Sequence, residues 1–299
     1  MRFNWKWDYI KHSKIFIIAS IVITLAGILF GSIFGLNYGV DFRSGTNMDI
    51  NMTKQVSQAE IQSLLAEQGI DEEIDFRPGN ERVSIRFANN LTDQQVNKIQ
   101  TAFHEKLDPS AAFEVNTVDA EMAKELERNA MLAVLIACVA IAIYVSIRFE
   151  WRFAIAAIVS LLHDAILVIA VFSIFQLEIG LIFITAILTI IGFSINDTIV
   201  VFDRIRENAR FTKKKSPDSL KEIVNNSIAQ TMTRTLATVF TVFVAAVCLL
   251  IFGGASIRMF SLAMTIGLLF GAYSSIFIAA PLWLALKVRQ KPASTASKA

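Results

Sequence analysis

Cysteine is scarce in this chain: Cys138 and Cys248 are the only two among 299 residues, and both lie inside long apolar segments. Such positions exclude the disulfide framework that stabilises small secreted domains, and they argue equally against a thiolate metal site. We interpret both cysteines as packing residues.

The chain also lacks the local patterns that carry enzyme chemistry. It contains no HExxH sequence, no glycine-rich phosphate loop and no serine in a nucleophile elbow, and His104 stands alone in its hydrophilic segment. The sequence therefore predicts neither an enzyme nor a protein with a metal or an organic cofactor.

Charged residues are also scarce: they make up only 18% of the chain, while 54% of residues are hydrophobic and 23 are Phe. One soluble core of this length does not need so much apolar material, and a membrane span needs about 20 apolar residues. The composition predicts a polytopic membrane protein with six transmembrane helices. The apolar runs are Ile15–Phe34, Ala130–Ile147, Phe153–Phe175, Ile179–Phe202, Thr235–Phe252 and Phe260–Leu286.

The positions of Lys and Arg predict the orientation, because short basic loops stay in the cytoplasm. Basic residues precede the first span, join the second to the third and the fourth to the fifth, and follow the sixth. We therefore predict cytoplasmic termini (1–14 and 288–299), a first span at 15–36, an extracytoplasmic domain at 37–128, and five spans within 129–287 with a cytoplasmic segment at 204–233.

The first span is predicted to be a retained anchor, since its apolar run is too long for a typical signal core and lacks a convincing cleavage site. Gly27, Gly31 and Gly35 are spaced four apart on one helix face, which favours close approach of another helix. The alternative is that glycine is simply common in membrane helices.

Residues 37–128 carry 17 acidic against 9 basic side chains, a net charge of −8, and are the only segment able to form a water-soluble core. Alternating and amphipathic patterns predict the order β-α-β-β-α-β, typical of a small α+β ferredoxin-like domain. Its Phe residues are interpreted as core, with a peptide-binding surface as the alternative. The elements are strand Thr46–Met52, helix Ser57–Gln68, strands Glu73–Arg77 and Arg82–Phe87, helix Thr92–Lys106 and strand Ala112–Val118.

Asp197 lies inside the fourth apolar run. A carboxylate at membrane depth is costly, so it usually faces a protein interior or a water path and works on ions or protons. Burial favours its protonated form and a nearby cation favours its ionised form, which allows proton gain and loss near neutral pH.

Three motifs resemble the SecF members of the SecD/SecF family of protein-export membrane proteins: GVDFRSGT at 39–46, LLHDAIL at 161–167 and GFSINDTIVVFDRIREN at 192–208. The chain has Ser44 where the family more often has Gly, and Phe193 where it more often has Tyr. The resemblance implies one half of a resistance-nodulation-division-type unit that pairs with SecD beside the SecYEG channel. It also implies that the proton-motive force drives late export of unfolded polypeptide, with protons as the coupling ion.

The resemblance matches Arg234 to the family's functional arginine, and we predict that Asp197 and Arg234 form a switchable pair. The alternative is a permanent ion pair that only fixes helix packing. Asp164 and His163, in the third span, are predicted to extend the proton path, although His163 is equally explained by a structural hydrogen bond. Adjacent residues point about 100° apart on a helix, so only one of them need face the fourth span.

Asp203, with Arg204 and Arg206, is predicted to anchor the loop at the cytoplasmic end of the fourth span. After the first span, Gly39, Asp41, Arg43 and Gly45 are predicted to form a hinge between membrane and domain, with a simple capped turn as the alternative.

The segment 204–233 combines a basic run with an amphipathic stretch from Ser219. We expect this stretch to lie along the membrane surface and the basic run to meet anionic lipid. No aromatic platform accompanies the basic run, so no nucleic-acid partner is predicted.

Two other functions compete with energy coupling in the inner membrane. One is a non-conducting scaffold that tethers SecD to the channel. The other is half of a proton-coupled exporter of lipids or drugs.

Overall fold

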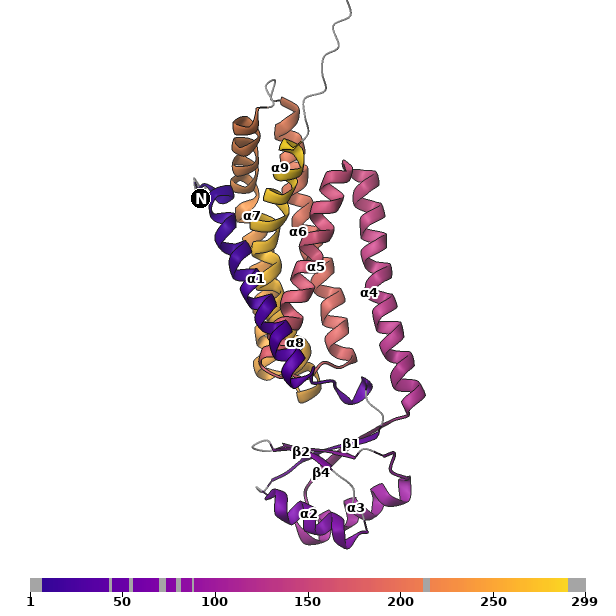
Figure 1. The fold of residues 1–299 in the computed structure, drawn as a ribbon. Helices are drawn as coiled ribbons and strands as arrows, with labels where there is room; N and C mark the ends of the chain where they lie inside the picture. The colour runs from indigo at the N-terminus through magenta and orange to yellow at the C-terminus, as the bar shows by residue number, and fades with distance from the viewer. Residues whose placement is uncertain are drawn as a thin grey trace, which may run out of the picture. The chain divides into compact units, whose positions relative to one another are not determined.

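The computed structural model describes residues 7–42, 45–53, 56–69, 74–78, 82–87, 89–211 and 216–289. The chain forms two compact units, one of Met1–Asn37 with Leu132–Ala299 and one of Tyr38–Met131. Figure 1 shows the first as a bundle of long helices and the second as a sheet with two helices. Each unit is described separately below.

Six helical segments in the described part of the chain are long and apolar enough to cross a membrane, and they match the six predicted runs except that the third run ends one residue later and the fourth begins two residues earlier. In the segments Trp151–Ile174, Leu181–Arg210 and Ile257–Val288, half or more of the most apolar stretch is buried inside the structure. In each of the other three segments this buried share is 11%. The third, fourth and sixth spans therefore form the interior of the bundle. The elements are α1 (Tyr9–Phe34), α4 (Ala120–Arg148), α5 (Trp151–Ile174), α6 (Leu181–Phe211), α7 (Pro217–Phe252), α8 (Ala255–Ser274), the π-helical turn η2 (Ser275–Ala279) and α9 (Ala280–Val288).

The predicted glycine face of α1 packs against α5. A Cβ atom added to Gly27 would lie 2.4 Å from Cβ of Ala170, and one added to Gly31 would lie 2.9 Å from Oγ of Ser173. The Ser173 hydroxyl donates to the carbonyl of Gly27 at 2.9 Å. Gly35 instead ends the helix with a φ of 74°, in the left-handed region that favours glycine. Two of the three glycines thus allow close helix contact.

Helix α7 corrects the expectation of a separate helix on the membrane surface. Pro217–Phe252 is one continuous helix of 36 residues, in which Ser216 caps the first turn. The apolar residues Leu220, Val224 and Ile228 are buried in a cluster that also contains Phe202 of α6. Because α6 covers this apolar face, it is not available to lipid.

Two helices extend beyond the predicted spans. The predicted domain boundary at residue 128 falls within α4, which runs without interruption from Ala120 to Arg148, since no Gly or Pro breaks it. The first predicted span begins at Ile15, but α1 begins at Tyr9 after Asp8, whose carboxylate accepts from the backbone N–H of Lys11.

The second unit has the predicted order β-α-β-β-α-β, and its four strands form an antiparallel sheet in the order β2-β3-β1-β4. Met48 of the central strand pairs with Ile85 on one side and Val115 on the other. Both helices cover the same face of the sheet (Figure 1). The elements are η1 (Val40–Phe42), β1 (Gly45–Asn51), α2 (Gln58–Glu67), β2 (Ile74–Pro78), β3 (Arg82–Phe87), α3 (Asp93–Lys106) and β4 (Ala112–Val118).

Local signals explain the two helices of this unit. Ser57 and Glu60 form a capping box at the start of α2, and Thr92 with Gln95 forms a second one at α3. The hydrogen bonds that Ser57 donates hold the pKa of the Glu60 carboxyl below its usual range.

The Phe residues of this unit form its core, as interpreted from the sequence. Phe87 and Phe103 are fully buried, and Phe76 and Phe113 pack against the same cluster. The rings of Phe103 and Phe113 meet edge to face at 5.4 Å. This cluster, rather than a peptide-binding surface, accounts for all four.

Candidate functional site

Helix α6 brings polar side chains into the interior of the bundle. Ser194, Asp197 and Thr198 are all buried, with Asp197 only 7% exposed. Residues three and four apart lie on one helix face, so Asp197 and Ser194 point to the same side of α6. The apolar residues around them, including Ile190 and Ile191, supply the packing that holds α6 between its neighbours.

Asp197 lines a cavity of about 180 Å³ between α6, α7 and α8. Its polar lining consists of Ser194, Asn196, Asp197, Thr238 and Thr241. Several lining residues, including Asn196 and Thr241, are exposed, so the cavity reaches the surface of the helical unit.

The carboxylate of Asp197 is weakly bonded for a buried acid. The hydroxyl of Thr238 lies 3.4 Å from Oδ1, and the same hydroxyl lies 3.0 Å and 2.9 Å from the carbonyls of Arg234 and Thr235. One hydroxyl proton serves three acceptors, so Asp197 does not have a donor of its own here. A buried carboxylate with so few donors is suited to bind a proton.

Arg234 lies one helical turn before Thr238 on α7 and is exposed. Among the residues that the structure describes, no ion pair joins it to Asp197. The structure thus brings both residues to one side of the α6–α7 contact without bonding them. Their switchable pairing stays a prediction.

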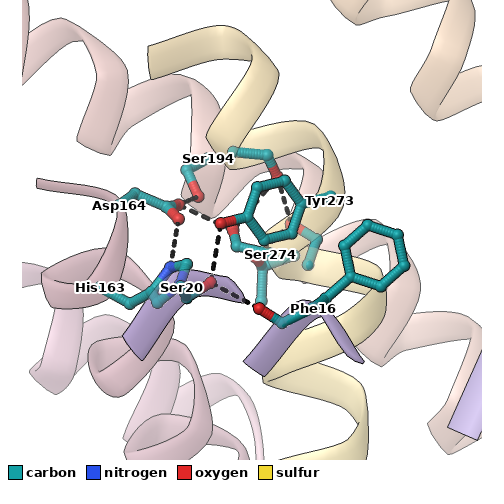
Figure 2. A network of polar contacts seen from close by, with 10 residues as sticks. Phe16, Ser20, His163, Asp164, Ser194, Tyr273 and Ser274 are labelled. Atoms are coloured by element: carbon teal, nitrogen blue, oxygen red, sulfur yellow. Dashed lines mark hydrogen bonds and ion pairs between the residues drawn. The ribbon is translucent and has the colours of Figure 1, made fainter. Parts of the chain in front are cut away.

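Asp164 of α5 is fully buried and strongly bonded. Its Oδ2 accepts from Ser194 Oγ at 2.5 Å and from Ser274 Oγ at 2.8 Å, and its Oδ1 lies 3.0 Å from His163 Nδ1. Figure 2 shows these groups converging from α5, α6 and α8. Three hydrogen-bonding groups from three helices thus converge on the carboxylate of Asp164.

His163 has one bonded and one unbonded ring nitrogen. Its Nδ1 faces Asp164, while its buried Nε2 has no partner among the described residues. The hydrogen bond to Asp164 is therefore made by Nδ1, and the role of His163 in a proton path stays a prediction.

Further polar contacts join α8 to its neighbours. The hydroxyl of Tyr273 lies 2.9 Å from that of Ser20 on α1, and Ser275 lies 2.8 Å from Thr198 on α6. Sequence reasoning missed Ser20 and the Tyr273–Ser275 segment. The available signal was a run of three hydroxyl residues inside the last apolar segment.

Asp203 does not lie at a helix end as predicted, because α6 continues to Phe211. It accepts from Arg206 at 2.5 Å and lies 3.9 Å from Arg148 at the end of α4. Arg204 instead pairs with Glu207 at 2.9 Å. Asp203 and Arg206 therefore connect α6 to the α4–α5 junction.

The predicted hinge residues fall around η1. Gly45 has a φ of 125°, which L side chains rarely adopt, and the N–H of Phe42 bonds to the carbonyl of Gly39 at 3.2 Å. Asp41 lies within η1, and Arg43 lies outside the described residues. Hinge motion stays a prediction.

Known proteins share this architecture. The family described as protein export membrane protein SecD/SecF, C-terminal, matches residues 98–289, and the SecD/SecF GG motif matches residues 30–56. The chain belongs to the SecD/SecF family. The GG motif region contains the predicted hinge, and the longer match contains both Asp164 and Asp197.

Relatives and solved structures agree with this family. Protein translocase subunit SecF of Alicyclobacillus acidocaldarius is 42% identical over 97% of this chain and 96% of its own length. SecDF of Bacillus subtilis is 45% identical over 95% of this chain but only 39% of its own length. The crystal structure of SecDF, a translocon-associated membrane protein from Thermus thermophilus, aligns with a TM-score of 0.85 at 32% identity, over 97% of this chain and 39% of that one. The chain thus spans about two fifths of each SecDF chain.

Groups of His, Cys, Asp and Glu that could hold a metal ion do not occur in the part of the chain that the structure describes. The arrangement offers two buried carboxylates, one weakly and one strongly hydrogen-bonded, on either side of Ser194.

Proposed function

We propose that this chain is an accessory subunit of the Sec protein translocase, which uses the proton-motive force with SecD to promote late steps of protein export. The family membership and the SecF and SecDF relatives support the role in export. The observation that carries the proton coupling is Asp197, a buried and weakly bonded carboxylate beside a cavity within a membrane-length helix.

The surface around this cavity supports pairing with SecD. Asn196 and Arg234 are exposed on a helical unit whose surface is otherwise largely apolar. Polar side chains at membrane depth face protein or water rather than lipid, where an arginine costs roughly 3 kcal/mol or more. A second six-helix half from SecD, covering this surface, would shield both residues and enclose the Asp197 cavity. The greater length of the SecDF relatives is consistent with such a second half.

The basic residues support the proposed orientation. Lys287 of α9 donates to Glu150 at the α4–α5 junction at 2.7 Å, and the bond and charge of Lys287 lower the pKa of the Glu150 carboxyl even though burial opposes this. Arg148 and Arg206 both form ion pairs with Asp203. These contacts gather basic residues from three connections at one end of the bundle, which we assign to the cytoplasm.

With this orientation both termini are cytoplasmic, and the acidic unit of Tyr38–Met131 is extracytoplasmic. Its element order and the strand order β2-β3-β1-β4 support a ferredoxin-like domain. We propose that unfolded polypeptide leaving the SecYEG channel is handled on this side of the inner membrane.

Energetics limit how one site can work. A proton that crosses 100 mV supplies about 2.3 kcal/mol. Moving a two-state element from 1:99 to 99:1 needs about 5.5 kcal/mol. Coupling therefore requires several protons or an element whose two states are nearly balanced.

The test replaces Asp197 with Asn, which keeps the shape of the side chain and removes its titration. Asp203→Asn is the matched control, because it makes the same change on the same helix at a side chain that is 49% exposed. Each variant is expressed with SecD, and both complex assembly and proton-driven export in membrane vesicles are measured. We expect both variants to assemble and only Asp197→Asn to lose proton-driven export. Normal export by Asp197→Asn would instead support a scaffold.

A further inference from the structure

Three consecutive residues at the end of α8 bond to three different helices. Tyr273 meets Ser20 of α1, Ser274 donates to Asp164 of α5, and Ser275 meets Thr198 of α6. Figure 2 shows Tyr273 and Ser274 beside Asp164 and Ser20. The segment Tyr273–Ser275 is therefore a point where the positions of four helices are tied together.

The hydroxyl of Ser274 has one proton and two acceptors. It lies 2.8 Å from Oδ2 of Asp164 and 3.2 Å from the carbonyl oxygen of Gly271 in its own helix. A serine hydroxyl donates only one hydrogen bond but can also accept. Which acceptor it uses depends on whether Asp164 carries a proton.

The backbone changes geometry at this segment. The N–H of Ala280 bonds to the carbonyl of Ser275, five residues earlier, which is the pattern of a π-helix. The carbonyl of Gly271 already accepts from the N–H of Ser275 and lies 3.3 Å from its hydroxyl. Single π-helical turns inside α-helices occur frequently at functional sites.

We propose that Ser274 is a positioning residue that senses the protonation state of Asp164 and transmits it to the π-helical turn between α8 and α9. The proposal rests on the proposed function, which supplies the protons. With Asp164 ionised, Ser274 donates to Oδ2. When a proton binds Oδ2, the new O–H donates to Ser274 Oγ, and the hydroxyl of Ser274 turns to the carbonyl of Gly271.

This exchange adds one proton to Asp164 and breaks no covalent bond. Its consequence is a stronger side-chain bond at Gly271, in competition with the backbone bond from Ser275. Serine bonds to the preceding turn bend helices and loosen their backbone bonds. The turn Ser275–Ala279 is thus the element that responds, and Tyr273 places α1 next to it.

The groups that face Asp164 set its response to pH. Among the described residues, the titratable ones are His163 of α5 and Tyr273 of α8, whose phenol lies close enough to interact with the carboxylate. Helix α6 contributes the hydroxyl of Ser194, and α1 contributes the hydroxyl of Ser20 through Tyr273. Asp197 lies beyond Ser194 and faces the cavity.

The experiment compares three serine-to-alanine variants in the complex with SecD. Ser274→Ala removes a donor to Asp164 and also the hydroxyl that can bond to the carbonyl of Gly271. Ser194→Ala removes a donor to the same oxygen, and among the residues that the structure describes the Ser194 hydroxyl bonds to none on α8. Ser261→Ala is the matched control, since Ser261 is equally buried on α8 and its hydroxyl bonds only to the carbonyl of Ile257.

Proton-driven export in membrane vesicles is measured across pH for each variant. Losing one donor to a carboxylate disfavours its ionised form, so the export profile of both Ser194→Ala and Ser274→Ala should move to higher pH by about one unit. Only Ser274→Ala should also lower the maximum rate of export several-fold. Ser261→Ala should match the unmodified chain.

Two results would overturn the proposal: a Ser274→Ala profile equal to that of Ser261→Ala, or one that shifts like Ser194→Ala without any loss of maximum. If Ser274→Ala fails to assemble, the isosteric pair Ser274→Thr and Ser274→Val supplies the same comparison, with export expected only in the variant that keeps a hydroxyl. Failure of this proposal is separable from failure of the proposed function, because the latter is decided by Asp197→Asn alone.

Discussion

The contact between α1 and α5 should fail when a single methyl group is added at Gly27. The added Cβ would lie 2.4 Å from Cβ and 2.5 Å from Cα of Ala170, and the Cα belongs to backbone that cannot rotate away. Carbon atoms in favourable contact are about 3.5–4.0 Å apart. The two helices must therefore separate by roughly 1 Å at this point.

Three terms decide the size of the effect. Overpacking of this kind costs about 1–3 kcal/mol. Separation also lengthens the bond from Ser173 to the carbonyl of Gly27, which is worth about 0.6 kcal/mol on average for hydrogen bonds between membrane helices. Alanine recovers about 0.5–1 kcal/mol of helix propensity over glycine. We expect Gly27→Ala to destabilise the chain by about 0.6–3 kcal/mol in net terms.

Thermal unfolding of the detergent-purified chain measures this change. Gly192→Ala is the matched control, because Gly192 is also helical and a Cβ added there meets no atom within 4 Å. We expect Gly192→Ala to keep or raise the midpoint of unfolding and Gly27→Ala to lower it. The double variant Gly27→Ala/Ala170→Gly should recover little of the loss, because the 2.5 Å contact with the Cα of residue 170 remains. Equal midpoints for Gly27→Ala and Gly192→Ala would refute the packing argument.

Three further perturbations test other parts of the molecule. Lys221 holds the pKa of Asp8 at about 2, so the bond of Asp8 stabilises the fold above about pH 4 and is lost as the pH falls toward 2. Since that carboxyl is about a third exposed, we expect its bond to contribute only about 1 kcal/mol to the free energy of unfolding. Denaturation of the unmodified chain is compared with that of Asp8→Asn, and the difference between them should shrink on acidification. Thr92→Ala removes the cap of α3 and should lower stability by about 1 kcal/mol, whereas Thr101→Ala, within the same helix, should not. Val224→Asp buries an unpaired charge between α6 and α7 and should prevent accumulation of the folded chain, which an exposed change such as Glu222→Gln would not do.

Local signals made much of the fold predictable. The capping residues Ser57 and Thr92 started the helices of the small unit where expected, and alternation placed β4 at its observed bounds. Apolar length located the six membrane helices. Helix ends were less predictable, because α4 and α7 continue through polar residues where hydropathy ends.

The candidate site was predictable only in its charged members. Asp197 and Asp164 stand out because a carboxylate in an apolar run is rare, but serine and tyrosine are ordinary in such runs. Ser274 acquires its role from contact with a residue 110 positions away, and Tyr273 from one 253 positions away. No local pattern reports contacts at that separation, so these residues required the packing of α1, α5, α6 and α8.

Ser194 explains why the two carboxylates differ. Its hydroxyl donates to Asp164, while the residue also lines the cavity of Asp197. The single proton of this hydroxyl cannot serve both acids, and here it serves Asp164. Asp197 is left with the shared hydroxyl of Thr238. The asymmetry of the site thus follows from the direction of one serine: turned toward Asp164, it adds a donor there and leaves Asp197 with only the shared hydroxyl of Thr238.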